Sequence, residues 1–290
     1  MPEYDPLYVA ARSVLLDALE ALGSQRDAVI VVGAQAVYLQ VSDDVDAGPH
    51  TMDADLSFAP YTTDADLAVA PADLADAPLL EDLMRRADFI LDEQQPGAWV
   101  KSVTVDGQAV KIPVDIMVPE GVAPPGGRRS VRLGPHDKMA ARKALGLEGA
   151  LIDNDEIEIF SLDDQDGRGF TVRVAGPAAL VVAKLHKLHE RLESGRQDRV
   201  ADKDAADVYR IMQGVPVDAF IERIRPLLRD PRSEAPTRAG LAFLGELFGA
   251  RASRGVQMAV EALRVAIPAD RVEEICVSFT RQLRGRLAAD

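Results

Sequence analysis

The stretch TMDADLSFAPYTTDADLAVAP, from Thr51 to Pro71, contains the pattern T-x-D-A-D-L twice in succession. In each copy the aspartates lead into alternating or continuous apolar residues, which is typical of a strand. Residues two apart in a strand point to the same side, so Asp64 and Asp66 project together, as do Asp53 and Asp55. Paired carboxylates without a cationic neighbour repel each other, and the sequence therefore predicts a bound cation at one of the two copies.

A further acid lies in a second strand pattern. The segment WVKSVTV-DG-QAVKIPVDIMVP predicts a β-hairpin that turns at Asp106-Gly107, with Asp115 in its second strand. An unpaired acid in an apolar strand is costly to bury, so Asp115 is expected to face a metal, a cation or a cleft. Three acids on neighbouring strands could hold two Mg²⁺ ions together with the phosphates of a substrate.

Towards the N-terminus, AVIVVGAQAVYLQ changes its period at a glycine. Val29–Val32 form a short β-branched strand, Gly33 makes a turn, and residues 34–40 continue as a helix. Backbone N–H groups at such a helix start can face an anion. The segment is therefore a candidate phosphate-binding element beside the acids.

The remainder of the chain divides near Gly176. Residues 1–175 mix strand and helix patterns, including a short helix over 78–89 and a basic helix over 137–147. Residues 176–290 contain only helical patterns, beginning with GPAALVVAKLHKLHERL, where Pro177 occupies the first helical position. The predicted fold class is α+β, with a mixed N-terminal domain over 1–175 and an all-helical C-terminal domain over 176–290.

Composition narrows the class of protein. No apolar run in the 290 residues is long enough to cross a bilayer, and the N-terminus lacks the basic start of a signal peptide. The single cysteine, Cys276, fits a reducing cytoplasm, where we expect the protein to reside. A net charge of −14 disfavours non-specific binding of nucleic acid by the whole surface, although a local basic groove remains compatible with it.

The order VVGAQAVYLQ, TTDADL, IPVDIMVP, AKLHKLHER and DKDAADVYR resembles nucleotidyltransferase-fold proteins of the AbiEii type. Within these it is most similar to actinobacterial members related to the MenT toxins. The resemblance spans roughly residues 5–212 and implies a polymerase-β-like core, a mixed sheet flanked by helices. It further implies Mg²⁺, a nucleoside triphosphate donor, transfer to a tRNA 3′ end as a growth-inhibiting toxin, and a cognate antitoxin.

The family motifs are carried over residue by residue. Gly33 and Ala34 match the helix-start motif, in which Ala34 departs from the usual Gly-Ser or Gly-Gly and removes a hydroxyl that could touch phosphate. The metal motif, TTD-x-DL, matches Thr63, Asp64 and Asp66, and the third acid matches Asp115. The resemblance therefore places the metal at the second copy of the repeat.

The first copy stays open as an alternative. Gly33 is 20 residues from Asp53 and 31 from Asp64, and this spacing alone favours Asp53 and Asp55 as the metal pair. The second copy leads directly into the linker and helix before the hairpin that carries Asp115.

The helical half contributes its own candidates. Lys184 matches a family lysine that can neutralise triphosphate charge, and Asp204 and Asp207 match the family's K-D-x-x-D stretch. These two acids lie three apart on one helix and could orient Lys184 or accept a proton. The alternative for all three is a solvated helix surface.

Together these features predict a Mg²⁺-dependent nucleotidyltransferase that moves a nucleoside monophosphate to an acceptor hydroxyl. Asp64, Asp66 and Asp115 would bind metal, Asp115 would also act as base or orient the acceptor, and Gly33 with Lys184 would hold the triphosphate. Two rival hypotheses remain. One is a small-molecule nucleotidyltransferase of the aminoglycoside-modifying kind, which suits an acidic cleft, and the other is a catalytically inactive nucleotide-binding module, which Ala34 makes conceivable.

Overall fold

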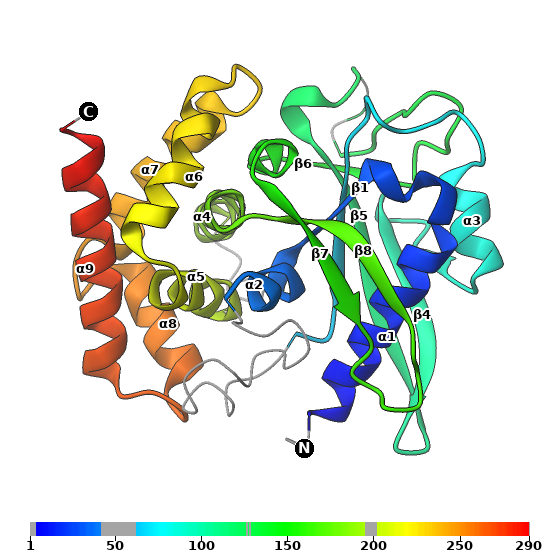
Figure 1. Ribbon diagram of the computed structural model, residues 1–290, viewed down its shortest axis with the longest axis horizontal. Coiled ribbons are helices and arrows are strands. Elements are labelled where there is room, and N and C mark those ends of the chain that lie inside the picture. Colours follow the sequence, from blue (N-terminus) through cyan, green and yellow to red (C-terminus); the bar gives the residue numbers. More distant parts are fainter. Residues whose placement is uncertain (1–3, 42–61, 126, 128, 195–201, 290) are drawn as a thin grey trace.

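The computed structural model describes residues 4–41, 62–125, 127, 129–194 and 202–289. In these residues a mixed eight-stranded sheet is followed in the chain by a region of helices, so the α+β class is confirmed. Figure 1 shows the sheet and the C-terminal helices side by side, with α2 (Gly33–Val41) between them. The first T-x-D-A-D-L copy, with Asp53 and Asp55, lies outside the described residues.

The centre of the sheet is built from short apolar strands. The strand β1 (Val29–Val32) is buried at every position and pairs antiparallel with β2 (Ala65–Val69) and parallel with β8 (Gly169–Ala175). On its other side β2 pairs parallel with β5 (Gln108–Pro119). Because both faces of β1 are covered, this strand is a continuous run of apolar residues rather than an alternating one.

The predicted hairpin is confirmed. Strand β4 (Ala98–Val105) pairs antiparallel with β5, and the turn residues Asp106 and Gly107 both have positive φ, at 51° and 77°. That geometry is the type I′ turn, whose twist matches that of the flanking strands. The outer strands β3 (Ile90–Leu91) and β7 (Asn154–Phe160) complete the two edges of the sheet.

The basic helix predicted over 137–147 is wrong. The chain there makes turns and then the strand β6 (Arg142–Ala144), which pairs parallel with β5. Gly146 at φ 87° ends the segment with a backbone conformation that a helix does not use. Pairing with a neighbouring strand, which local sequence does not reveal, outweighs the helical pattern here.

Helices surround the sheet and build the rest of the core. The helix α1 (Pro6–Ala21) packs along β2, β4, β5 and β8, and α3 (Leu80–Arg86) is a shorter version of the predicted helix over 78–89. After β8 come α4 (Pro177–Glu193), α5 (Asp202–Gly214), α6 (Val217–Arg229), α7 (Glu234–Phe248), α8 (Arg254–Leu263) and α9 (Ala269–Leu287). No helix among the described residues is long and apolar enough to span a membrane.

The helical region and the sheet share one hydrophobic core. The helix α2 contacts β1 and β2 on one side and α4 and α5 on the other. Buried residues form one continuous cluster from α1 through the sheet to Cys276 and Leu283 on α9. Residues at the carboxyl end of β1 and the start of β2 are consequently brought next to side chains of α4 and α5. The proposed division at residue 176 remains a prediction.

Candidate active site

Asp64, Asp66 and Asp115, which we call the acid row, lie side by side at the start of β2 and within the neighbouring strand β5. The register pairs Asp66 on β2 with Asp115 on β5, and neighbouring strands are spaced about 4.8 Å apart. Asp64 precedes β2 by one residue and has the parity of Asp66. The expectation that Asp115 adjoins the second acid doublet is therefore confirmed.

The glycine of the predicted helix start lies directly against this row. Val32, the last residue of β1, is the register partner of Asp66, and Gly33 follows it with φ at 75°. A Cβ built on Gly33 would lie 2.1 Å from Oδ2 of Asp66, so the close approach requires glycine. Ala34 is buried, whereas Thr63 is exposed.

Polar contacts fix the backbone around Asp64. The side-chain amide of Gln35 on α2 donates to the Asp64 carbonyl and to the Ala11 carbonyl, at 3.2 Å each. Arg12 of α1 in turn donates to Oε1 of Gln35 at 3.0 Å. Gln35 and Arg12 are buried, so this link joins α1, α2 and the acid row in a fixed arrangement.

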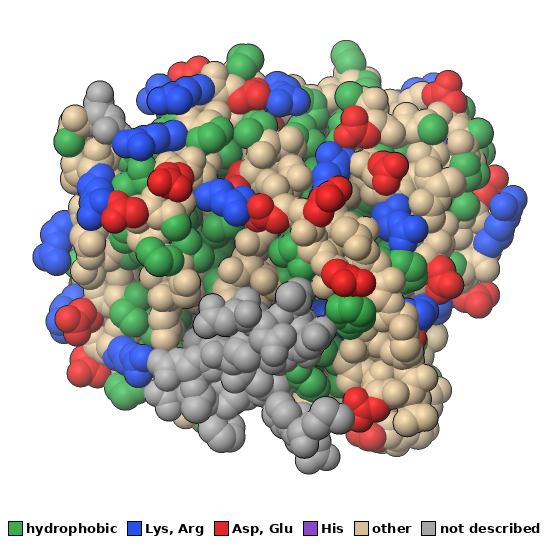
Figure 2. All heavy atoms as spheres, viewed as in Figure 1, with side chains coloured by type: hydrophobic (Ala, Val, Ile, Leu, Met, Phe, Trp, Pro, Cys, Tyr) green, Lys and Arg blue, Asp and Glu red, His purple; other side chains and the backbone are tan. Residues whose placement is uncertain are grey.

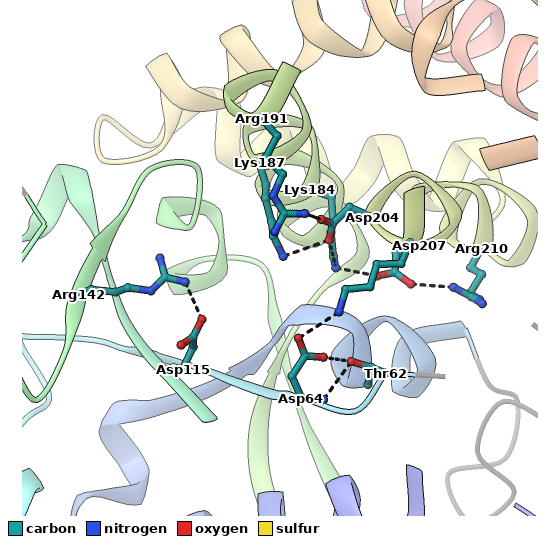
Figure 3. A network of polar contacts seen from close by, with 11 residues as sticks. Thr62, Asp64, Asp115, Arg142, Lys184, Lys187, Arg191, Asp204, Asp207 and Arg210 are labelled. Atoms are coloured by element: carbon teal, nitrogen blue, oxygen red, sulfur yellow. Dashed lines mark hydrogen bonds and ion pairs between the residues drawn. The ribbon is translucent and has the colours of Figure 1, made fainter. Parts of the chain in front are cut away.

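Two of the three carboxylates have a cationic partner. Lys203 donates to Oδ2 of Asp64 at 3.3 Å, and the hydroxyl of the buried Thr62 also bonds to the Asp64 carboxylate. Arg142 on β6 donates to Oδ2 of Asp115 at 2.8 Å. Figure 3 shows the carboxylates of Asp64 and Asp115 turned toward different partners.

The carboxylate of Asp66, between them, has no hydrogen-bond or ion-pair partner among the described residues. Burial raises its pKa to about 6, the neighbouring Asp64 and Asp115 carboxylates add to the rise, and Lys187 and Lys184 oppose it. A carboxyl group with this surrounding gains from any cation that approaches it. Of the three carboxylates in the acid row, that of Asp66 is thus the one without a cationic partner in the described part of the chain.

The donor set fits a divalent metal ion, since carboxylate oxygens are the ligands that Mg²⁺ prefers. Within the described ranges, however, no group of three or more His, Cys, Asp or Glu side chains is gathered as a metal ion would need. Asp64 and Asp115 are instead paired with Lys203 and Arg142. Metal binding by the acid row stays a prediction.

Next to the acid row lies a second group of charges, which we call the ionic cluster: Lys184, Asp204 and Asp207 with Arg191 and Arg210. The ammonium of Lys184 on α4 donates to Asp204 at 2.9 Å and to Asp207 at 2.7 Å, both on α5. Arg191 bonds to Asp204, and Arg210 bonds to Asp207 at 2.8 Å. Figure 3 shows the contacts of Lys184 and Arg191 bridging the two helices above the acid row, whereas that of Arg210 lies within α5.

The solvated-surface alternative for these residues is wrong. Lys184, Asp204 and Asp207 are 5%, 0% and 1% exposed. Burial acts to lower the pKa of Lys184, but Asp207 and Asp204 outweigh it and raise that pKa above its ordinary value. The prediction that the two acids orient Lys184 is confirmed. Direct contact of these three residues with a nucleotide is not supported, because their side chains are buried and bonded to one another.

Sequence reasoning missed the cations that face the acid row, namely Arg142, Lys187 and Lys203. The ammonium of Lys187 lies 3.2 Å from Oδ1 of Asp204. Its position three residues after Lys184 was a usable signal, because residues three apart share a helix face. Lys203 likewise precedes Asp204 directly.

Four further polar or aromatic residues have structural roles. His186 bonds through Nε2 to the Pro236 carbonyl at 2.8 Å, and His189 stacks on Phe243 with ring centroids 3.8 Å apart. Trp99 and Tyr38 are core residues.

Comparison with known proteins adds no assignment. No family model matches the chain, and no curated protein or solved structure matches it either.

Proposed function

We propose that this protein is a metal-dependent nucleotidyltransferase with a polymerase-β-like core. The observation that carries the proposal is the pairing of Asp66 with Asp115 on adjacent strands, directly beside the glycine that begins α2. Asp64 lies two residues before Asp66 and completes the acid row. The resemblance to AbiEii-type proteins supports the same assignment.

The proposed transfer requires that the negative charge of the phosphates be neutralised. In the reaction, the acceptor oxygen forms a bond to the α-phosphorus while the bond from that phosphorus to pyrophosphate breaks. Bound Mg²⁺ would neutralise the phosphates and lower the pKa of the acceptor hydroxyl. Arg142 donates to Oδ2 of Asp115, and the Asp115 carboxylate would bind the metal or accept the hydroxyl proton. The backbone of α2 begins at the acid row, where its N–H groups favour the negative charge of a phosphate.

The acceptor is proposed from the resemblance and from charge. A tRNA 3′ end is our first choice, and a cognate antitoxin is the expected protein partner. Figure 2 shows one face of the molecule. On its described part, acidic and basic side chains are interspersed without one large basic patch. A small local footprint, such as the end of one strand, suits such a surface better than a long duplex does.

Incubation of the protein with Mg²⁺, each labelled nucleoside triphosphate and either total tRNA or aminoglycosides tests the proposal. Label on tRNA supports the favoured acceptor, and label on an aminoglycoside supports the small-molecule alternative. Nucleotide binding without any transfer would support the inactive-module alternative instead.

Site variants connect any activity to the acid row. Asp66→Asn and Asp115→Asn should each lower transfer by a factor on the order of 100 or more, since each removes a charge needed in the transition state. Glu158→Gln, an exposed carboxylate on the edge strand β7, is the matched control and should leave transfer unchanged. Full activity in Asp66→Asn would exclude the acid row as the catalytic site.

A further inference from the structure

Two exposed lysines, Lys187 and Lys203, lie beside the acid row, and each is paired with a single carboxylate among the described residues. The side chain of Lys187 on α4 is 38% exposed and lies 3.2 Å from Asp204, and that of Lys203 on α5 is 46% exposed and lies 3.3 Å from Asp64. Figure 3 shows Lys187 on the same helix as Lys184, with its side chain turned toward Asp204 above the acid row. Both lysines therefore flank the position where a substrate would approach the acids.

Lys184, which the sequence favoured as the phosphate ligand, is unsuited to that role. Its side chain is 6% exposed, and its ammonium donates to two carboxylates that are themselves buried. Moving Lys184 toward a phosphate would leave Asp204 and Asp207 as buried carboxylates without this partner, which is strongly unfavourable. The lysine is held in place by the fold.

Among the residues that the structure describes, cations outnumber carboxylates around Asp204 and Asp207. Four cations, Lys184, Lys187, Arg191 and Arg210, share these two carboxylates. Because Lys184 and Arg210 are the buried members, the surplus positive charge lies toward Lys187 and Arg191 at the surface. A surplus of this kind next to an acidic row favours a ligand that carries several negative charges of its own.

We propose that Lys187 and Lys203 bind the polyphosphate tail of the nucleotide, and that Lys184 with Asp204 and Asp207 positions them. The inference rests on the proposed function. Asp204 connects the pieces, because its carboxylate bonds to Lys184 and Lys187 and its backbone follows directly after Lys203. An ammonium on a flexible stem suits this task, since it follows a phosphate oxygen as a point charge. On binding, Lys203 exchanges Asp64 for phosphate, which frees that carboxylate.

Binding of inorganic tripolyphosphate by the full chain tests this assignment without any catalytic step. Calorimetric titration should show Lys187→Gln and Lys203→Gln each binding about tenfold more weakly than the unaltered protein, because each loses one charge-assisted contact. Lys203→Arg should recover most of the affinity. Lys111→Gln, which removes an exposed lysine from the far end of β5, is the matched control and should bind as the unaltered protein does.

Two results would overturn the inference. One is absence of tripolyphosphate binding by the unaltered protein, and the other is unchanged affinity in the Lys187→Gln, Lys203→Gln double variant. If transfer is observed and its KM for nucleotide is also unchanged in the double variant, the lysine assignment fails while the nucleotidyltransferase proposal stands. If tripolyphosphate binding depends on both lysines but no acceptor is ever labelled, the binding site stands and the catalytic proposal fails.

Discussion

The acid row and the ionic cluster are built from the same kinds of residue, yet the structure treats them in opposite ways. In the ionic cluster, the Lys184 ammonium and the Asp204 and Asp207 carboxylates are buried and bonded to one another. In the acid row, Asp66 and Asp115 remain partly exposed, and the carboxylate of Asp66 has no partner among the described residues. The two groups lie beside each other, on the helices and on the sheet.

The difference teaches how to separate structural charge from functional charge. Removing one partner of a buried ion pair is expensive, because the other charge is left buried and uncompensated. A partly exposed carboxylate among others of its own sign is a liability in the folded protein, and a bound cation offsets it. The ionic cluster should therefore respond to mutation mainly through stability, and the acid row mainly through ligand binding.

The largest effect is expected from Lys184→Met. This change leaves Asp204 and Asp207 buried without the ammonium that bridges them, and the free energy of unfolding should fall by about 3–5 kcal/mol. Urea denaturation followed by circular dichroism measures it. Lys187→Met, at a half-exposed position on the same helix, is the control and should change stability by less than about 1 kcal/mol. Equal losses in the two variants would contradict the distinction drawn here.

The pH dependence of stability should differ in sign between the two groups. The pKa of Asp66 is raised to about 6 in the folded protein from 3.8, so the folded state holds this proton more tightly than the unfolded state does. Its contribution to stability is therefore fully present below pH 3.8 and is lost as pH rises toward 6. The loss amounts to about 3 kcal/mol, since one pKa unit corresponds to about 1.4 kcal/mol.

Asp204 behaves in the opposite way. Burial acts to raise its pKa, but Lys184, Lys187 and Arg191 outweigh burial and hold the pKa below its ordinary value. Its contribution to stability is present above pH 3.8 and is lost as pH falls further. The contribution of Asp66 is measured as the difference in the free energy of unfolding between the unaltered protein and Asp66→Asn, determined from pH 4 to pH 7. A constant difference between the two proteins over this range would refute the assignment to Asp66.

A smaller effect is expected from Gly33→Ala. The new Cβ would lie 2.1 Å from Oδ2 of Asp66, and Gly33 has φ at 75°. Gly107→Ala is a matched control, because Gly107 has φ at 77° and an added Cβ there meets nothing within 4 Å. Both variants bear the same backbone strain, so the excess loss in Gly33→Ala, about 1–3 kcal/mol, reports the contact with Asp66. Equal losses by thermal unfolding would show that the acid row tolerates displacement.

Local features of the fold could be predicted from the sequence, and long-range ones could not. The turn at Asp106-Gly107 and the helix begun by Pro177 depend on backbone preferences of the residues themselves, and both were confirmed. The strand β6 was missed because pairing with β5, far away in the chain, decides its conformation. The basic and small residues of segment 137–147 do not indicate that it pairs with another strand.

The same limit applies to the candidate site. The D-x-D spacing and the in-strand position of Asp115 predicted that an acid doublet meets a third acid, whereas the choice of Asp64 and Asp66 over Asp53 and Asp55 depended on the resemblance, because spacing alone favoured the first copy. The burial of Lys184 was not predictable, because a lysine in a helix is ordinarily solvated and only the packing of α4 against α5 encloses it. The choice of Arg142 and Lys203 as counter-ions likewise depends on tertiary structure.

The smallest effect is expected from Arg142→Gln, and it tests whether Asp115 belongs to a metal site. The ion pair of Arg142 with Asp115 is partly exposed, so its loss should lower stability by less than about 1 kcal/mol. The affinity for Mn²⁺, a substitute for Mg²⁺, is measured by calorimetric titration. It should rise roughly three- to tenfold, because Asp115 loses the cation that competes for its carboxylate. A tenfold change corresponds to about 1.4 kcal/mol. Arg173→Gln removes another partly exposed arginine, paired with Asp73 at 3.1 Å, and should leave Mn²⁺ affinity unchanged. Unchanged or weaker Mn²⁺ binding in Arg142→Gln would mean that Asp115 does not bind a metal ion at this position. The acid row would then lack the third metal ligand that the proposed nucleotidyltransferase mechanism requires.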